Sequence, residues 1–388
     1  MSVPHHNHYV ANTVMAVVIA KKKKNLHLMA SRRTAIRKTK KVLRKLCFWS
    51  FSPPDSFKHT MNLPYDVLCE IASWLDVRSR LSWKASSKSF PNLPWKIVHF
   101  CGKSRRLAFS SVLSLVSRQT KHLTVWIPPP IVQCDHFHDL GKLVSCCHLR
   151  DLVLHNVHIG HRGCLSLADV LPHLPYLTNL CLHNNAIDDA GCSALAVALP
   201  RLKRLTTLDL SYNLINGPGA LSLIAALCQT TCLTTLNFTS NLLGVRRGDF
   251  YVAAATLPQL KCLTNLNLSC NGFVVEDVLP LAAAMPHMKC LTNLDLSMNY
   301  IGDDGCSTLA AVFPQMKCLA ILNLYANCIG DRGCLALGSA LSQMKCLKTL
   351  TLFENDFGDA GHAALASAVA GSTTSIFTST TYNVNYIY

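Results

Sequence analysis

The fold is decided by the stretch Leu291-Thr-Asn-Leu294-Asp-Leu296-Ser-Met-Asn299-Tyr-Ile301-Gly-Asp-Asp-Gly305, because its pattern returns throughout the second half of the chain. The motif Leu-x-x-Leu-x-Leu-x-x-Asn, or a variant with one position changed, starts eight times; six of the seven spacings are 28 residues and the fourth is 30. A fixed period of about 20–50 residues indicates stacked units that share one core. The eight starts are Leu149, Leu177, Leu205, Leu233, Leu263, Leu291, Leu319 and Leu347.

Each segment of the unit has a physical role. Alternating leucines such as Leu294 and Leu296 place one face of a strand in the core. The closing Asn lies where the chain leaves the strand, and its amide can satisfy backbone groups that no neighbouring strand pairs with. A Gly then opens an Ala/Leu-rich helix that ends near a Pro such as Pro200. The asparagines are Asn185, Asn213, Asn241, Asn271, Asn299, Asn327 and Asn355, with Val157 in the first unit.

In its length and its Gly-x-x-x-Leu-Ala helix, the unit resembles the ribonuclease-inhibitor-like class of leucine-rich repeats. The resemblance covers residues 149–371. It implies an α/β solenoid, a horseshoe with strands on the concave side and helices on the convex side. Such repeats serve inhibitors, immune receptors, GTPase activators and ligase adaptors, so the resemblance specifies fold more than function.

Positions 2, 4, 6 and 7 after each first leucine are predicted to point out of the concave strand face. They include four acidic residues and no Lys or Arg. Two interpretations stay open: an ordinary solvated sheet, or a mildly acidic groove that binds a basic segment of a partner protein or of this chain's own N-terminal arm. The candidate residues are Asp151, His155, His183, Asp209, Tyr212, Asp295, Met298, Tyr325, Phe353 and Glu354.

Residues 61–92 predict a small all-α module ahead of the repeats. Leu68, Ile71 and Leu75 fall on one helical face, and Pro64 suits a first helical turn. The stretch from Leu63 to Phe90 resembles an F-box, which implies docking to the Skp-type adaptor of a cullin-RING ubiquitin ligase. The alternative is a helical cap on the solenoid. The adaptor-binding candidates are Leu63, Pro64, Asp66, Val67, Leu68, Ile71, Leu75 and Leu81.

The formal charge of +16 belongs mostly to the N-terminal arm. Residues 1–60 hold 13 Lys or Arg against one acid, whereas residues from 149 onward hold 13 against 15. Nucleic acid is therefore not expected as a partner, and a membrane contact is expected only through the arm. A solvated tail and nuclear targeting are the arm's other interpretations. The expected divisions are an arm (1–58), the F-box-like module (61–92), a linker with a degenerate capping unit (93–148), eight repeats (149–371) and a tail (372–388).

The apolar run at 9–20 is too short to span a membrane, and its positive charges follow it, unlike those of a secretory signal. Cytosol or nucleus is therefore expected, with free thiols. The cysteines that recur with the repeat are interpreted as small buried hydrophobic side chains. They are Cys232, Cys262, Cys290, Cys318 and Cys346 before the first leucine, and Cys164, Cys192, Cys306 and Cys334 after the glycine. A second cluster suggests zinc, but its spacing matches no ligand pattern; it holds Cys134, His136, His138, Cys146, Cys147 and His148.

No catalytic motif is found, so we expect a non-enzymatic protein with no cofactor and no small-molecule substrate. The order of an F-box before repeats predicts the substrate-recognition subunit of a cullin-RING (SCF-type) ligase, partnered by the adaptor, the cullin and an unknown substrate protein. One alternative is a protein-binding scaffold or inhibitor without ligase association. Another is a GTPase activator that uses Arg246 or Arg247.

Overall fold

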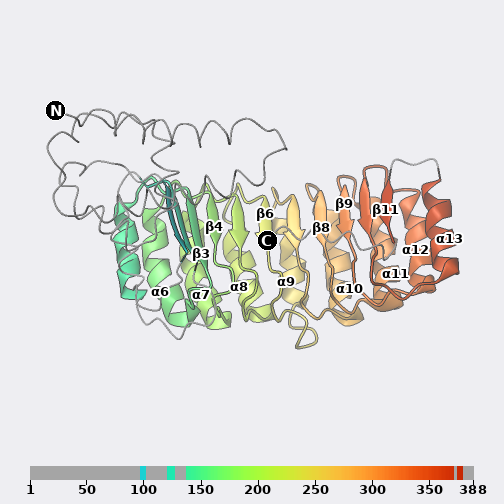
Figure 1. The fold of residues 1–388 in the computed structure, drawn as a ribbon, viewed down its shortest axis with the longest axis horizontal. Helices are drawn as coiled ribbons and strands as arrows, with labels where there is room; N and C mark the ends of the chain where they lie inside the picture. The colour runs from blue at the N-terminus through green and yellow to red at the C-terminus, as the bar shows by residue number, and fades with distance from the viewer. Residues whose placement is uncertain (1–96, 102–119, 127–136, 371–373, 379–388) are drawn as a thin grey trace, which may run out of the picture. The chain divides into compact units, whose positions relative to one another are not determined.

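The computed structural model describes residues 97–101, 120–126, 137–370 and 374–378. The chain divides into two compact units, 1–93 and 94–388, and the described residues all belong to the second. This unit is one layer of eleven parallel strands, each paired with the next along the chain, and one layer of helices (Figure 1). The solenoid predicted from the repeat period is confirmed. The F-box-like module at 61–92 lies outside the described residues.

The strands are β1 (Ile97–Cys101), β2 (His122–Trp126), β3 (Asp151–His155), β4 (Asn179–Cys181), β5 (Thr207–Asp209), β6 (Thr235–Asn237), β7 (Asn265–Asn267), β8 (Asn293–Asp295), β9 (Ile321–Asn323), β10 (Thr349–Thr351) and β11 (Ser375–Phe377). The α-helices are α6 (Gly160–Val170), α7 (Asp189–Ala198), α8 (Gly217–Leu227), α9 (Tyr251–Thr256), α10 (Val275–Ala284), α11 (Gly302–Val312), α12 (Asp331–Leu341) and α13 (Asp359–Val369). The 3₁₀ segments are η2 (Phe137–Ser145), η3 (Leu171–His173), η4 (Leu199–Arg201), η5 (Leu257–Gln259), η6 (Met285–His287) and η7 (Phe313–Gln315).

The strand register joins equivalent positions of successive units. Asn179 of β4 pairs with Asp151 of β3 and with Thr207 of β5, one repeat away on either side. Neighbouring strands lie about 4.8 Å apart, whereas packed helices need about 8–10 Å. The stack must therefore curve with its strands on the inside, which makes the outward strand face concave.

A leucine ladder forms the core between the two layers. In one unit, Leu291, Leu294 and Leu296 are each at most 1% exposed, and their equivalents in the other units are also buried. Helix α7 ends at Ala198, just before Pro200, which is the middle residue of the 3₁₀ turn η4. Leucine alternation and proline position thus correctly predict the strand face and the helix ends.

The asparagine ladder performs the predicted backbone role and also joins neighbouring repeats. The Asn299 Nδ2 group donates to the carbonyls of Leu296 and Ser297 in its own unit and of Leu268 in the preceding one. Its Oδ1 accepts from the backbone N–H groups of Asn271 and Phe273. One amide therefore satisfies five groups that the strands leave unpaired.

Acidic residues at the helix starts bind the next repeat in a similar way. Asp303 Oδ1 accepts from the backbone N–H groups of Gly330 and Gly333, each at 2.8 Å, at the start of α12. Asp331 does the same for Gly358 and Gly361 at the start of α13. A Cβ on Gly333 would stand 2.7 Å from Asp303 Oδ1, so the recurring glycine makes room for the carboxylate. These acids stabilise helix N-termini.

The strand layer extends beyond the eight predicted repeats. Strand β2 lies in the stretch 93–148, which was predicted to hold the capping unit. In the tail, where no repeat pattern was found, Ser375–Phe377 adds β11 beside β10. Part of the stretch 93–148, including residues 102–119, lies outside the described residues. Among those that are described, no helix is long and apolar enough to cross a membrane.

Candidate functional site

The concave face consists of four rows of side chains, at positions 2, 4, 6 and 7 of each repeat. Rows 2 and 4 lie on the strands, and rows 6 and 7 on the turns that follow them. All eight residues of row 7, from Asn156 to Glu354, have a φ near +55°. In the seven repeats that carry it, the ladder asparagine follows this left-handed residue and holds the turn, as Asn299 does by donating to the Leu296 and Ser297 carbonyls. The face is therefore a rigid array with one set of side chains per repeat.

Three of the predicted residues form an aromatic stack at the N-terminal end of the concave face. The rings of His155 and His183 stack with centroids 4.2 Å apart, and the ring of Tyr212 follows at 4.8 Å from His183. His183 Nδ1 shares a hydrogen bond of 2.7 Å with the Ser211 hydroxyl. Because equivalent positions of adjacent repeats lie about 4.8 Å apart, flat rings in successive repeats stack naturally.

Both histidines of the stack favour the neutral form. Burial, and then the neighbouring His183, lower the pKa of His155, while Asp209 opposes this. Burial also lowers the pKa of His183, again opposed by Asp209. Near neutral pH the stack is therefore an uncharged aromatic surface.

This pKa shift predicts a pH dependence of stability. The unfolded chain has histidine pKa values near 6.5, above those of the folded chain. As the pH falls below about 6.5, the unfolded state binds protons that the folded state does not, and stability falls. The double variant His155→Gln, His183→Gln is expected to lose less stability than the wild type between pH 7 and pH 5 in urea unfolding. The exposed His173→Gln is the control, and equal pH slopes in all three proteins would contradict the prediction.

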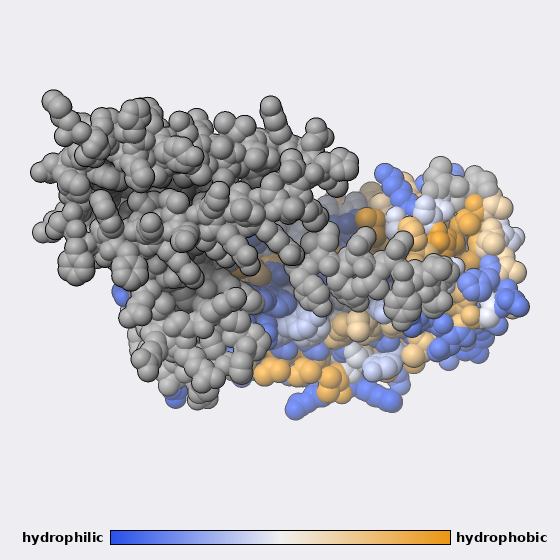
Figure 2. Space-filling model, viewed as in Figure 1, coloured by the Kyte–Doolittle hydropathy of each residue, from blue (hydrophilic) through white to orange (hydrophobic). Residues whose placement is uncertain are grey.

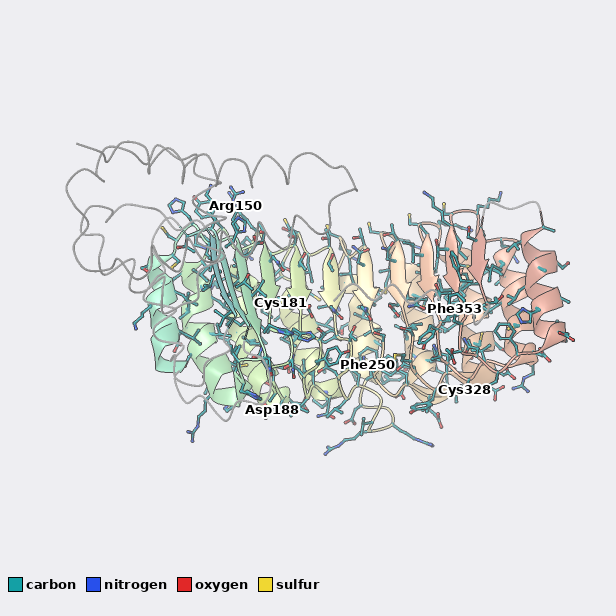
Figure 3. The ribbon with its side chains drawn as sticks, in the orientation of Figure 1. Arg150, Cys181, Asp188, Phe250, Cys328 and Phe353 are labelled. Atoms are coloured by element: carbon teal, nitrogen blue, oxygen red, sulfur yellow. The ribbon has the colours of Figure 1, made fainter. Side chains whose placement is uncertain are left out.

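Three of the four predicted acids of the face are already engaged in hydrogen bonds. Asp209 Oδ1 accepts from the backbone N–H and hydroxyl of Ser211, and Oδ2 accepts from the thiol of Cys181, which is labelled in Figure 3. Asp295 accepts from Ser297 in the same way and from Asn323 Nδ2. Asp151 hydrogen-bonds to His122. The face is thus more a polar hydrogen-bonded ladder than a strongly acidic groove.

The predicted aromatic end of the face includes a residue that sequence reasoning missed. Phe353 is half-buried, and its ring lies 6.2 Å from that of Phe377 on β11. Phe377 was missed because it follows no repeat motif. Tyr325 is also half-buried, and its backbone N–H donates to Asn323 Oδ1. Glu354 is exposed beside them.

Large apolar side chains continue from the concave face onto the edge where the strands end. We call four of them, Tyr212, Leu214, Met298 and Tyr300, the apolar rim. Tyr212 and Met298 were predicted and are each 53% exposed. Leu214 (48%) and Tyr300 (67%) were missed, although they and the predicted pair flank the buried ladder residues Asn213 and Asn299. The pattern x-Asn-x, with a large apolar residue on each side, could have identified them. Figure 2 shows apolar surface along this lower edge of the view.

The recurring cysteines divide into two groups. Cys164, Cys192, Cys306 and Cys334 are buried as predicted, and burial raises the pKa of Cys164 and of Cys334 to about 12. The prediction was wrong for the group before the first leucine, because these thiols lie in the turn ahead of each strand and point to solvent. They are Cys232, Cys262, Cys290, Cys318 and Cys346.

Two other groups of candidate residues remain: the Cys/His cluster at 134–148, which is only partly described, and the pair Arg246 and Arg247. Cys146 is buried, and Cys147 Sγ lies 3.3 Å from His148 Nδ1. The rest of that cluster lies outside the described residues or has no described side chain. Nowhere in the described part of the chain do three His, Cys, Asp or Glu side chains gather as a metal site would require. Arg247 pairs with Glu276 at 3.3 Å on the exposed loop of the fourth repeat.

Comparison with known proteins supports the repeat assignment. The family model described as "Leucine Rich repeat" matches residues 173–196, 203–223, 287–310, 315–338 and 343–366. No curated protein matches the chain. A solved internalin (inlF) from Listeria monocytogenes is similar with a TM-score of 0.42 and 20% identity, over 69% of this chain and 69% of that chain. The actin-binding site 2 of leiomodin-1 gives a TM-score of 0.31 and 24% identity, over 34% of this chain and 78% of that chain. The chain therefore contains leucine-rich repeats, a class of structure that binds protein partners.

Proposed function

We propose that the chain is a non-catalytic receptor whose concave face and apolar rim bind one protein partner. The observation that carries the proposal is the continuity from the neutral stack of His155, His183 and Tyr212 to the exposed Leu214. Binding energy at protein interfaces concentrates in a few aromatic and apolar side chains surrounded by polar contacts. The hydrogen-bonded Ser, Thr and Asn rows would supply that surround on a pre-ordered scaffold.

We further propose that the receptor delivers its partner to an SCF-type ubiquitin ligase in the cytosol or nucleus. The support is the F-box-like sequence from Leu63 to Phe90 ahead of the repeats. In this role Leu63, Pro64, Val67, Leu68 and Ile71 would dock the Skp-type adaptor and through it the cullin. A scaffold or inhibitor without ligase association has the same concave face and is the alternative.

A pull-down with purified Skp-type adaptor and cullin tests the ligase assignment. The wild type should retain both proteins, and the double variant Leu68→Asp, Ile71→Asp should lose both. The variant Tyr212→Ala, Tyr300→Ala is the control, because it changes the apolar rim and should keep the adaptor. No retention by the wild type would reject the ligase role and leave the scaffold. Stimulated GTP hydrolysis by a GTPase would instead favour the activator.

The partner segment that we propose for the concave face is basic. Asp209 and Asp295 lie in row 4 of the concave face, and no Lys or Arg lies on any of the four rows. The chain's own arm has the required charge, so we propose that it competes for the face. Deletion of residues 1–58 should then raise the affinity for a basic peptide ligand in fluorescence titrations. An unchanged affinity would reject competition by the arm.

A further inference from the structure

The repeats are near neutral in net charge, but their positive and negative side chains lie mostly on opposite edges of the solenoid. The turns before the strands contain nine cations, and no acid is found in the stretches that join each helix to the next strand. The opposite edge holds ten acids and four arginines. In Figure 3, Arg150 marks the first edge and Asp188 the second. We call the first the basic edge; its members are Arg150, Arg201, Lys203, Arg204, Lys261, Lys289, Lys317, Lys345 and Lys348.

Four of these cations recur at one structural position. Lys261, Lys289, Lys317 and Lys345 each stand two residues before the first leucine of consecutive repeats, and all four are exposed. The strand register places them along one ridge, one lysine per repeat. Among the described residues, no ion pair joins any cation of the basic edge to a carboxylate. The ridge is therefore an uncompensated row of positive charge.

The backbone groups where the chain enters each strand along the same edge are already paired. The N–H of Thr206 donates to the carbonyl of Thr178, and that of Thr234 donates to Thr206, a pattern that continues from repeat to repeat. The threonine hydroxyls donate to the same carbonyls. An extended peptide that adds a strand needs a continuous row of free main-chain groups, and the strand-entry groups of this edge are already paired. A partner would therefore bind this edge mainly through the ammonium groups of the edge's long, flexible lysine side chains.

The arrangement also disfavours a single-stranded nucleic acid. Single strands bind on aromatic side chains interleaved with cations. The ridge from Lys261 to Lys345 alternates Lys with the exposed cysteines instead. Tyr176, farther along, already lies under Arg204, 4.8 Å from its guanidinium.

We infer that the basic edge docks the repeats on an anionic membrane surface. A ridge of equivalent turns can touch a flat surface along its whole length, so every lysine reaches the negative headgroups at once. Lysines near an anionic bilayer each add to the attraction, without any fixed hydrogen-bond geometry. The concave face and apolar rim are not part of this ridge, so a docked receptor could still bind its partner.

Vesicle co-sedimentation of the full chain tests the inference. The vesicles are phosphatidylcholine alone or equimolar phosphatidylcholine and phosphatidylserine. The variant with Lys261, Lys289, Lys317 and Lys345 each changed to Gln should lose about tenfold or more in affinity for the anionic vesicles. The matched control removes the same charge from the opposite edge by changing Arg162, Arg246, Arg247 and Arg332 to Gln. It should bind nearly as the wild type does.

A lysine-to-arginine version of the four-site variant keeps the charge and should restore binding. If the glutamine variant unfolds in thermal melts, the pair Lys289→Glu, Lys317→Glu replaces it. The inference would be overturned if the four-lysine glutamine variant and the four-arginine control variant lost equal affinity for the anionic vesicles. A fall in affinity only when residues 1–58 were deleted would overturn it as well. It would also be overturned if the lysine variant lost affinity for polyglutamate or single-stranded DNA while keeping that for vesicles.

Discussion

Replacing Asn299 with alanine is expected to lower the free energy of unfolding by about 4 kcal/mol. The substitution removes the acceptor of the Asn271 and Phe273 backbone N–H groups and the donor to three carbonyls. A buried group left without a hydrogen bond costs about 1–3 kcal/mol, and the two N–H groups lose the partner that they have in the structure. Because the amide spans two repeats, the loss also weakens the interface that couples them.

Two comparisons make this prediction specific, with urea unfolding followed by circular dichroism as the measurement. Asn327→Ala should cost less, because the Asn327 Oδ1 atom is buried without a hydrogen-bond partner and only its Nδ2 group would be lost. Asn293→Ala, on the concave face of the same repeat as Asn299, should stay within about 0.5 kcal/mol of the wild type. Equal effects at Asn299 and Asn293 would show that water replaces the amide, against the prediction.

The strand register and the asparagine ladder could be predicted because one hydrogen-bond pattern is repeated with the sequence. Leu294, Leu296 and Asn299 meet the same neighbours in every unit, so residue type and spacing specify their contacts. The exposed thiols could not be predicted in this way. Cys290 is apolar enough for the core, but its position before Leu291 faces the turn, and composition does not distinguish the two environments.

Parts of the site escaped prediction for related reasons. Leu214 and Tyr300 are large and apolar, yet the adjacent buried asparagines turn them outward. β11 carries no leucine motif, but an open strand edge can be extended by backbone pairing alone. The Ser375 N–H donates to Lys348, and the Leu352 N–H donates to Phe377. Such pairing depends on the position of the chain and not on side-chain type, so Phe377 was missed.

The irregular fourth repeat is stabilised by a pair of phenylalanines. Its unit is two residues longer than most, and α9 has only six residues. Phe250, which precedes α9, and Phe273 of the next repeat are both completely buried, with ring centroids 5.0 Å apart (Figure 3). At the position of Phe273, regular units such as the sixth have an isoleucine, Ile301. The larger ring therefore fills the space that the longer loop opens.

Phe273→Ala is accordingly expected to cost about 3–5 kcal/mol in urea unfolding, since it leaves a cavity beside Phe250 that the rigid repeats cannot close. Gly244 already approaches so closely that an added Cβ would stand 2.9 Å from the Phe273 ring, which shows how tightly the loop packs there. Phe273→Ile should recover only part of the loss, because the isoleucine of a regular unit does not replace the aromatic partner of Phe250. The control is Phe353→Ala on the half-exposed end of the concave face, with a smaller expected cost. A similar loss for Phe273→Ala and Phe353→Ala would mean that the two rings do not hold the fourth repeat in the array.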